Sequence, residues 1–223
     1  LALRSADLVT ASSKVLQADL MTLSGRSVQL IPNGVGWPFL DTPQHDATRP
    51  RRPLVGCLGY LSSWVDFDLI EHVARSLPEL DFEFIGPVDN ACTSQVDRLR
   101  GLPNVQFAGF LATEDLPARL DAFQVGIIPF KVSPLTRAMN VNKLYEYAAR
   151  NLPIVTTNFS PELDEFADRV DVCETPKELV RVLADRGAGL GIRETRPIAE
   201  SHTWAAVSRS FDELIFSALA GHQ

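Results

Sequence analysis

From residue 54 onward, short apolar runs alternate with stretches of helical periodicity. The apolar runs predict strands at 54–58, 82–85, 104–108, 124–128, 153–157 and 170–173. The periodic stretches predict helices at 66–77, 91–100, 113–122, 138–150, 161–167, 176–186 and 203–219. This alternation is typical of an α/β fold with a parallel Rossmann-like sheet and helices on both faces. Uninterrupted apolar strands fit that prediction, because both of their faces are covered.

The beginning of the chain has a different pattern. Apolar spacing predicts one helix over 5–23, ended by Gly25, and then a short strand at 28–31. Residues 41–53 are polar and rich in proline, with no periodicity, which predicts a loop. We therefore expect a small leading piece at 1–40, a linker at 41–53 and a main domain at 54–223.

Composition narrows the classes of function. The 223 residues carry a formal net charge of −7, so a general basic surface for nucleic acid is not expected. The sequence has no apolar run of about 18 residues and no basic leader before an apolar run, so neither a membrane span nor a signal peptide is predicted. Three widely spaced cysteines without a CxxC pair indicate a reducing, cytoplasmic setting.

Ligands of parallel sheets bind beyond the carboxyl ends of the strands, so residues after each strand are candidates. Gly59 follows the first main strand, where a glycine lets backbone amides approach a phosphate. Taken alone, a tight strand-to-helix turn is the simpler interpretation of this glycine. The glycines at 187–191 follow a helix and not a strand, which predicts a helix end and not a dinucleotide fingerprint.

The stretch 127–157 is the most informative part of the sequence. A helix is predicted to begin between 138 and 141, with its amino end at the strand ends. There, backbone amides and Lys143 would face a diphosphate, and Glu146 one turn later would accept hydrogen bonds from vicinal hydroxyls such as those of a ribose. The same spacing equally fits a solvated helix face with an ordinary Lys143–Glu146 pair.

Other groups of polar residues give weaker indications of function. The four histidines are scattered, so we expect no metal site. Glu162, Asp164 and Glu165 follow Pro161, and the first turn of a helix is a better interpretation of them than a pair of catalytic carboxylates.

Several segments resemble, in order, the C-terminal half of GT-B glycosyltransferases, above all the group 1 glycosyltransferases of bacterial polysaccharide biosynthesis. The matching segments lie at 6–12 (AD-x-V-x-x-S), 31–35 (IPNGV), 102–109 (l-x-NV-x-f-x-G), 140–149 (NPxKxYEYLA) and 152–155 (xPVV). Each motif is weak alone, and their order makes the resemblance specific.

The resemblance implies a domain that binds a nucleotide-sugar donor, and it implies roles for particular residues. Glu146 would hold the ribose, the loop after the 104–108 strand would meet the base, and Gly59 would lie beside the phosphates. The helix containing Trp204 would cross back toward an N-terminal domain. The residues implied for the base are Gly109, Phe110 and Leu111, and those for the diphosphate and sugar are Lys131, Thr136, Asn140, Val141, Asn142 and Lys143.

Two departures from the family pattern shift this prediction. Ala138 stands where many members have a first glutamate, eight positions before Glu146. Ser62, Ser63 and Trp64, with Asp66 close behind, stand where many members have Arg and Lys. Diphosphate binding would therefore rest more on the remaining cations, which are Lys131, Arg137 and Lys143.

The implied function is transfer of a hexosyl group from a UDP- or GDP-linked sugar to a saccharide or lipid-linked acceptor, without a metal cofactor. In the family a separate N-terminal domain binds the acceptor, and this chain resembles the family from the last helix of that domain onward. We therefore expect no catalytic residue in this half, and an inactive fragment when the chain is alone. The full-length protein would be cytoplasmic, with peripheral membrane association allowed.

Two alternatives stay open. One is a nucleotide-sugar epimerase or hydrolase of the same architecture, although the sequence shows no convincing acid and base pair for it. The other is a catalytically inactive nucleotide-sugar binding or interaction module, in which the departures at Ala138 and Trp64 mark lost activity.

Overall fold

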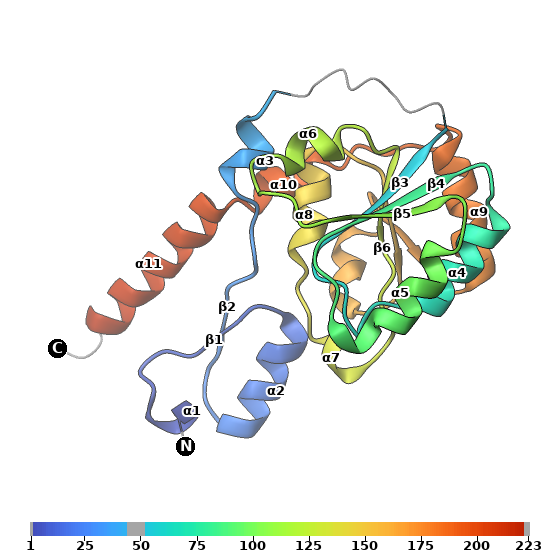
Figure 1. The fold of residues 1–223 in the computed structure, drawn as a ribbon. Helices are drawn as coiled ribbons and strands as arrows, with labels where there is room; N and C mark the ends of the chain where they lie inside the picture. Colours follow the sequence, from blue (N-terminus) through green and yellow to red (C-terminus); the bar gives the residue numbers. More distant parts are fainter. Residues whose placement is uncertain (1, 44–51, 221–223) are drawn as a thin grey trace.

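The computed structural model describes residues 2–43 and 52–220, and its main body is a parallel six-stranded sheet (Figure 1). The strand order is β5-β4-β3-β6-β7-β8. The strands are β3 (Leu54–Leu58), β4 (Asp81–Ile85), β5 (Val105–Gly109), β6 (Val125–Ile128), β7 (Ile154–Thr157) and β8 (Asp171–Cys173). All six predicted strands, and the α/β fold with its parallel sheet, are confirmed.

Helices pack on both faces of this sheet. On one side α4 contacts α5 and α9, and on the other α8 contacts α3 and α10, with α6 beside α3 (Figure 1). The first group is α4 (Phe67–Ser76), α5 (Thr93–Arg100) and α9 (Pro176–Gly187), and the second is α3 (Trp37–Asp41), α6 (Leu116–Leu120), α8 (Asn142–Ala149) and α10 (Arg196–Ser201). Short elements between them are η1 (Asn90–Cys92), α7 (Pro134–Arg137) and η2 (Pro161–Phe166).

The sheet opens where its strand order reverses, between β3 and β6. These two strands pair only at Val55 with Val125 and at Gly56 with Gly126. Beyond that point the backbone amide of Leu58 donates to the hydroxyl of Tyr147 at 2.7 Å instead of to a strand. In open α/β sheets, this reversal point is where ligands bind, beyond the carboxyl ends of the strands.

The beginning of the chain corrects one prediction. The helix predicted over 5–23 is wrong in its first half: α1 (Ala2–Ser5) ends where that helix was predicted to begin, Thr10–Ala11 form the strand β1, and α2 (Lys14–Ser24) starts only after Ser13. β1 pairs in parallel with β2 (Gln29–Leu30). A strand of two residues has no periodicity of its own, so only its distant partner defines it.

Three helices of the main body, α3, α7 and α10, were not predicted, and one predicted helix begins later than expected. The helix predicted over 138–150 is α8, which starts only at Asn142. The late start has a local cause, because Ser133 and Thr136 form a capping box that starts the separate helix α7, and Val141 is extended. Part of the predicted linker, residues 44–51, lies outside the described residues.

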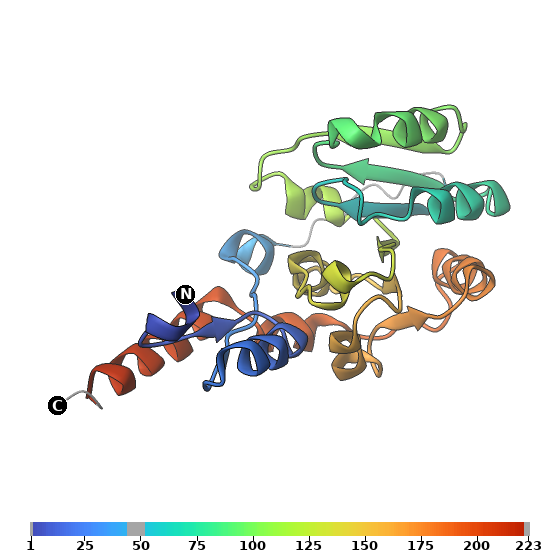
Figure 2. The same ribbon diagram turned by 90° about the horizontal axis from the view of Figure 1, so that it is seen from below.

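The described part of the chain has two apolar cores. Val9, Ala11 and Val28 form a small one, and the main core contains the sheet together with Val35 and Phe39. The last helix, α11 (Trp204–Ala220), extends away from the sheet in both views (Figures 1 and 2). No helix among the described residues is both long enough and apolar enough to cross a membrane.

Candidate functional site

Lys143, in the first turn of α8, is a buried cation that forms no salt bridge with any carboxylate of the described residues. The residue is only 8% exposed, and its Nζ lies 4.7 Å from the centre of the Phe130 ring. Within residues 2–43 and 52–220, its ammonium has neither a salt bridge nor a hydrogen bond. Burying a charge is costly unless it is paired, so this position favours an anion that comes from outside the chain.

Two glycines leave room in front of this cation. Gly59, directly after β3, has φ +111°, and a Cβ there would lie 3.4 Å from both Cε and Nζ of Lys143. Gly86, directly after β4, has φ +135°, and a Cβ there would lie only 2.2 Å from the carbonyl oxygen of Gly59. The two strand ends therefore approach so closely that only glycine fits.

Glu146 follows Lys143 by one turn of α8 and is half-buried. Burial raises the pKa of its carboxyl from 4.5 to about 7, although the nearby Lys143 acts in the opposite direction. No hydrogen bond or ion pair to it occurs within the described part of the chain. A desolvated carboxylate without a protein partner is a strong acceptor for hydroxyl groups.

The amino end of α8 adds backbone amides to these two side chains. The capping residue, Val141, makes no side-chain hydrogen bond to the helix, and Asn142 is exposed. The first amides of a helix have no partner within it, and the helix dipole there favours negative charge. The start of α8 therefore combines free amides, a cation and a carboxylate within a little more than one turn.

Asn140, just before this helix, has a different environment from the predicted one. Its Oδ1 accepts from the backbone amide of Asn33 at 2.9 Å, and its Nδ2 donates to the Tyr145 hydroxyl at 2.8 Å. Both ends of its side-chain amide are thus used within the protein.

The loop before α8 holds three more of the predicted residues. Thr136 is fully buried, and its hydroxyl donates to the carbonyl of Lys131 at 2.6 Å, so its side chain shapes the loop. Lys131 and Arg137 are exposed. The backbone amide of Lys131 donates to the carbonyl of Trp64 at 2.8 Å, which joins the loops that follow β6 and β3.

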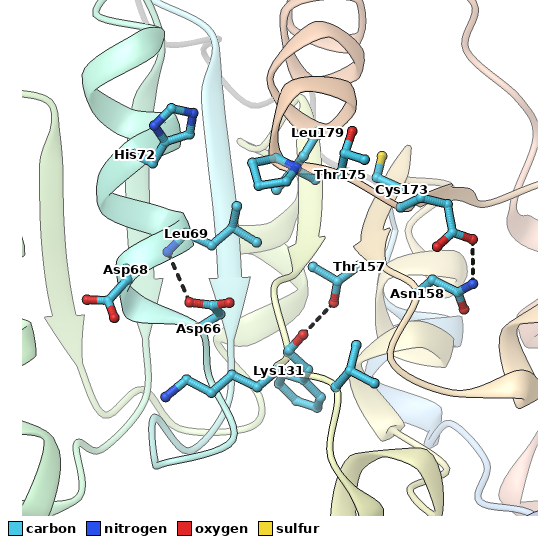
Figure 3. A pocket seen from close by; sticks show the side chains of 14 residues that line it. Asp66, Asp68, Leu69, His72, Lys131, Thr157, Asn158, Cys173, Thr175 and Leu179 are labelled. Carbon is cyan, nitrogen blue, oxygen red and sulfur yellow. Dashed lines mark hydrogen bonds between the residues drawn. The ribbon is translucent and has the colours of Figure 1, made fainter.

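Lys131 also lines a cavity of about 420 Å³ between the amino ends of α4 and α9 (Figure 3). Asp66 lies on the α4 side of this cavity, and Cys173 and Thr175 lie on the α9 side (Figure 3). Asp66 caps α4, because its Oδ1 accepts from Leu69 at 3.0 Å. Neither Lys143 nor Glu146 lines this cavity, but Phe130, whose ring lies against the Lys143 ammonium, does, so the cavity adjoins the site at the start of α8.

The residues predicted to meet a base lie at and just after the carboxyl end of β5. Gly109 has φ +73°, Phe110 is 78% exposed, and Leu111 packs partly against the core. In the sheet, β4 separates β5 from β3, so the ends of β5 and β3 are roughly 10 Å apart. That distance fits a ligand longer than a diphosphate.

The departures from the family pattern have structural roles. The carbonyl of Ala138 accepts from the hydroxyl of Ser13 at 2.8 Å. The Trp64 ring lies 5.9 Å from that of Tyr60, and the Ser62 hydroxyl donates to Asp89 at 2.7 Å. No cation stands at these positions.

The acidic cluster after Pro161 holds the leading piece. An oxygen of Glu162 accepts from the backbone amide of Lys14 at 2.8 Å, and Glu165 forms a salt bridge with the Lys14 Nζ at 2.6 Å. Both carboxylates therefore bind the start of α2. This is not the first turn of an α-helix, since residues 161–166 form the 3-10 helix η2.

Sequence reasoning missed Phe130 as a residue of this site. Phe130 was not assigned a role in the loop after β6, yet its ring lies 4.7 Å from the Lys143 ammonium. The available signal was its position just after a strand end.

Comparisons with known proteins add three findings. A family model described as "Glycosyl transferases group 1" matches residues 52–186. A Bacillus subtilis (strain 168) protein, whose name assigns it provisionally as the teichuronic acid biosynthesis glycosyltransferase TuaH, is 26% identical over 93% of this chain and 56% of its own length. The chain thus spans little more than half of that relative.

Solved structures share the fold. HepE of Anabaena, in complex with UDP and glucose, aligns with a TM-score of 0.72 at 18% identity. The alignment covers 97% of this chain and 64% of the HepE chain. The sucrose-phosphate synthase of Thermosynechococcus elongatus aligns with a TM-score of 0.76 at 17% identity, over 98% of this chain and 60% of its own. Both likenesses show a shared architecture of the GT-B type.

Proposed function

The chain belongs to the group 1 glycosyl transferases, and from that premise we propose that it is the donor-binding part of an enzyme that transfers a sugar from a nucleotide sugar. One observation carries the proposal. The buried ammonium of Lys143 has no anionic partner among the described residues, and it lies beside Gly59 at the amino end of α8.

In this proposal each part of the site binds one part of the donor. The diphosphate lies between Gly59, Lys143 and the first amides of α8. The ribose hydroxyls donate to Glu146, and the base lies by Gly109 and the two residues after it. Negative charge grows on the diphosphate as the glycosidic bond breaks, and prepositioned amides and a cation stabilise that charge without a metal ion.

The donor and acceptor are the finer part of the proposal. UDP is the nucleotide we expect first, because the HepE structures contain UDP, and a hexosyl group is the expected cargo. The teichuronic acid assignment of TuaH supports a saccharide or lipid-linked acceptor in polysaccharide biosynthesis. A cytoplasmic site, peripheral to the membrane in the full-length protein, fits three free buried cysteines.

This chain by itself is proposed to bind donor without turnover. It spans 56% of TuaH and 64% of the HepE chain, and the site described above contains no acid and base pair for hydrolysis or epimerisation. The acceptor and the catalytic groups would come from the part of the relatives that this chain does not span.

Calorimetric titration with UDP, GDP and ADP tests the proposal on the chain as it is. We expect UDP to bind, and Lys143→Ala to weaken UDP binding about tenfold or more while uridine binding is retained, because a charged hydrogen bond to phosphate contributes about 1.5–3 kcal/mol. Glu146→Ala should weaken UDP and uridine alike, since both contain the ribose.

Lys177→Ala is the matched control, because Lys177 is exposed on α9 and should leave UDP binding unchanged. If the wild-type chain releases no heat with any of the three nucleotides, it is an inert interaction module. If Lys143→Ala and Glu146→Ala bind UDP like the wild type, UDP binds elsewhere.

A further inference from the structure

The segment that joins the leading piece to the main domain is held against the start of α8 by Asn33. Its backbone amide donates to Oδ1 of Asn140 at 2.9 Å, and its Nδ2 donates to the carbonyl oxygen of Asn140 at 2.6 Å. Asn140 in turn donates through Nδ2 to the Tyr145 hydroxyl at 2.8 Å. Three hydrogen bonds thus join residue 33 to residue 145.

The junction between α10 and α11 completes a ring of contacts. The Tyr145 ring stacks on His202, with centroids 4.8 Å apart and an interplanar angle of 22°. The carbonyl of His202 accepts from the amide of Val35 at 2.8 Å, and the amide of Trp204 donates to the carbonyl of Val35 at 3.1 Å. The contacts therefore return to the chain two residues after Asn33.

Gly34 lets the joining segment approach this junction. A Cβ at Gly34 would lie 2.9 Å from the carbonyl carbon of Thr203 and 2.9 Å from the amide nitrogen of Trp204. Real Cβ atoms essentially never approach backbone atoms so closely, and backbone atoms cannot give way cheaply. The joining segment, the α10–α11 junction and the start of α8 are therefore one packed unit.

We infer that Asn33, Asn140 and Tyr145 are positioning residues that set where the first turn of α8 lies. The inference rests on the proposed function, because Lys143 and the free amides of that turn are what it places. Val141 gives α8 no side-chain cap, so the contacts of the preceding Asn140 fix how the chain enters the helix. Tyr145 is only 1% exposed and does not reach a ligand itself.

The donor affinity of this site would thus depend on how the joining segment is seated. The joining segment and the α10–α11 junction both contact this ring, so a displacement of either one would reach the start of α8. A shift of either segment breaks or tilts the Asn33–Asn140 pair, and this moves the amides that face the diphosphate.

Two variants that leave the ligand contacts intact test the inference. Tyr145→Phe and Asn33→Ala should each weaken UDP binding about threefold to tenfold, the effect of one or two lost hydrogen bonds. Uridine binding should be unchanged, because the first turn of α8 acts on the diphosphate. The double variant should lose no more UDP affinity than the more impaired of the two single variants, since both changes disrupt the same ring of contacts.

Thr195→Val is the matched control for a purely structural effect. Thr195 is fully buried, and its hydroxyl donates to the carbonyl of Leu152 at 3.1 Å, beyond the carboxyl end of α8. This variant should lower the melting temperature about as much as Tyr145→Phe while binding UDP like the wild type. An equal loss of UDP affinity in Thr195→Val would overturn the inference, since overall stability would then explain it.

Hydrogen exchange without ligand separates this inference from the proposed function. The amide of Leu144, which donates to the carbonyl of Val141 at 3.2 Å, should exchange faster in Asn33→Ala than in the wild type, and at the wild-type rate in Thr195→Val. If the wild type binds UDP but neither test variant changes its affinity, the proposed function stands and the inference fails. If no nucleotide binds, the proposed function fails, and unchanged exchange at the start of α8 overturns the inference independently.

Discussion

At the scale of single residues, burial and not identity distinguishes the site. A Lys and a Glu three residues apart on a helix are common on solvated faces, and there they pair with each other. In this chain the Lys143 residue is 8% exposed, and burial raises the pKa of Glu146 to about 7. Neither forms a salt bridge within the described residues, so both keep their binding capacity for a ligand.

The raised pKa predicts that UDP binding depends on pH. Ribose hydroxyls donate to the ionised carboxylate, so affinity should fall about tenfold between pH 8 and pH 6 as Glu146 takes up a proton. Titration calorimetry at several pH values measures this fall. In Glu146→Gln, the pH dependence of affinity that is due to Glu146 should disappear, and only the dependence due to the phosphate should remain. A pH profile identical to that of the wild type would contradict the assignment.

The same pKa predicts a change in stability of defined sign. The folded protein holds this proton more tightly than the unfolded chain, so Glu146 favours folding most below pH 4.5, and that contribution is lost as the pH rises toward 7. The unfolding free energy of Glu146→Gln minus that of the wild type should therefore be larger at pH 8 than at pH 4. Urea unfolding at both pH values tests this; a constant difference would refute it.

At the scale of elements, the ends of the parallel strands make the site, and glycines decide how closely those ends approach. Gly56 and Gly126 face each other across β3 and β6, and a Cβ on either would clash with the ring of Phe123 or Tyr147. The rings of these two aromatic residues therefore pack directly on the sheet at its reversal point. Beyond the glycines, β3 and β6 separate.

Gly86→Ala tests the close approach of β3 and β4. Its Cβ would meet the Gly59 carbonyl, so we expect a loss of several kcal/mol in unfolding free energy, and weaker UDP binding because Gly59 must move. Gly189→Ala is the control, since Gly189 also has positive φ but has nothing within 4 Å of a Cβ. That control should cost only about 1 kcal/mol and leave UDP binding intact.

At the scale of the whole molecule, one buried arginine joins the chain before the main domain to the ends of α8 and α6. Arg150 pairs with Asp121 at 2.6 Å, with their side chains 1% and 4% exposed. It also donates to the carbonyls of Phe39, Thr42 and Pro43. The region around α3 is therefore part of the folded main body, although the sequence pattern assigns it to the leading piece and the linker.

Arg150→Met should lower the free energy of unfolding by about 3–5 kcal/mol, because it breaks the buried ion pair with Asp121 and removes the hydrogen bonds to the α3 region. Arg75→Met should change it by less than about 1 kcal/mol, since Arg75 forms an exposed pair on α4. Denaturant unfolding measures both. Equal small losses would mean that the buried ion pair does not hold α3.

The amino-acid sequence by itself determined the sheet and the family. Apolar runs and helical periodicity are local, so they predicted the six strands of the main sheet within one residue at each end, and the order of short motifs matched the group 1 glycosyl transferases. Only the tertiary structure decided which residues, far apart in the sequence, contact one another. β1 exists because Gln29–Leu30 lies beside it, and Asn140 binds Asn33, a residue 107 positions away. Such contacts depend on the path of the whole chain, which no local pattern records.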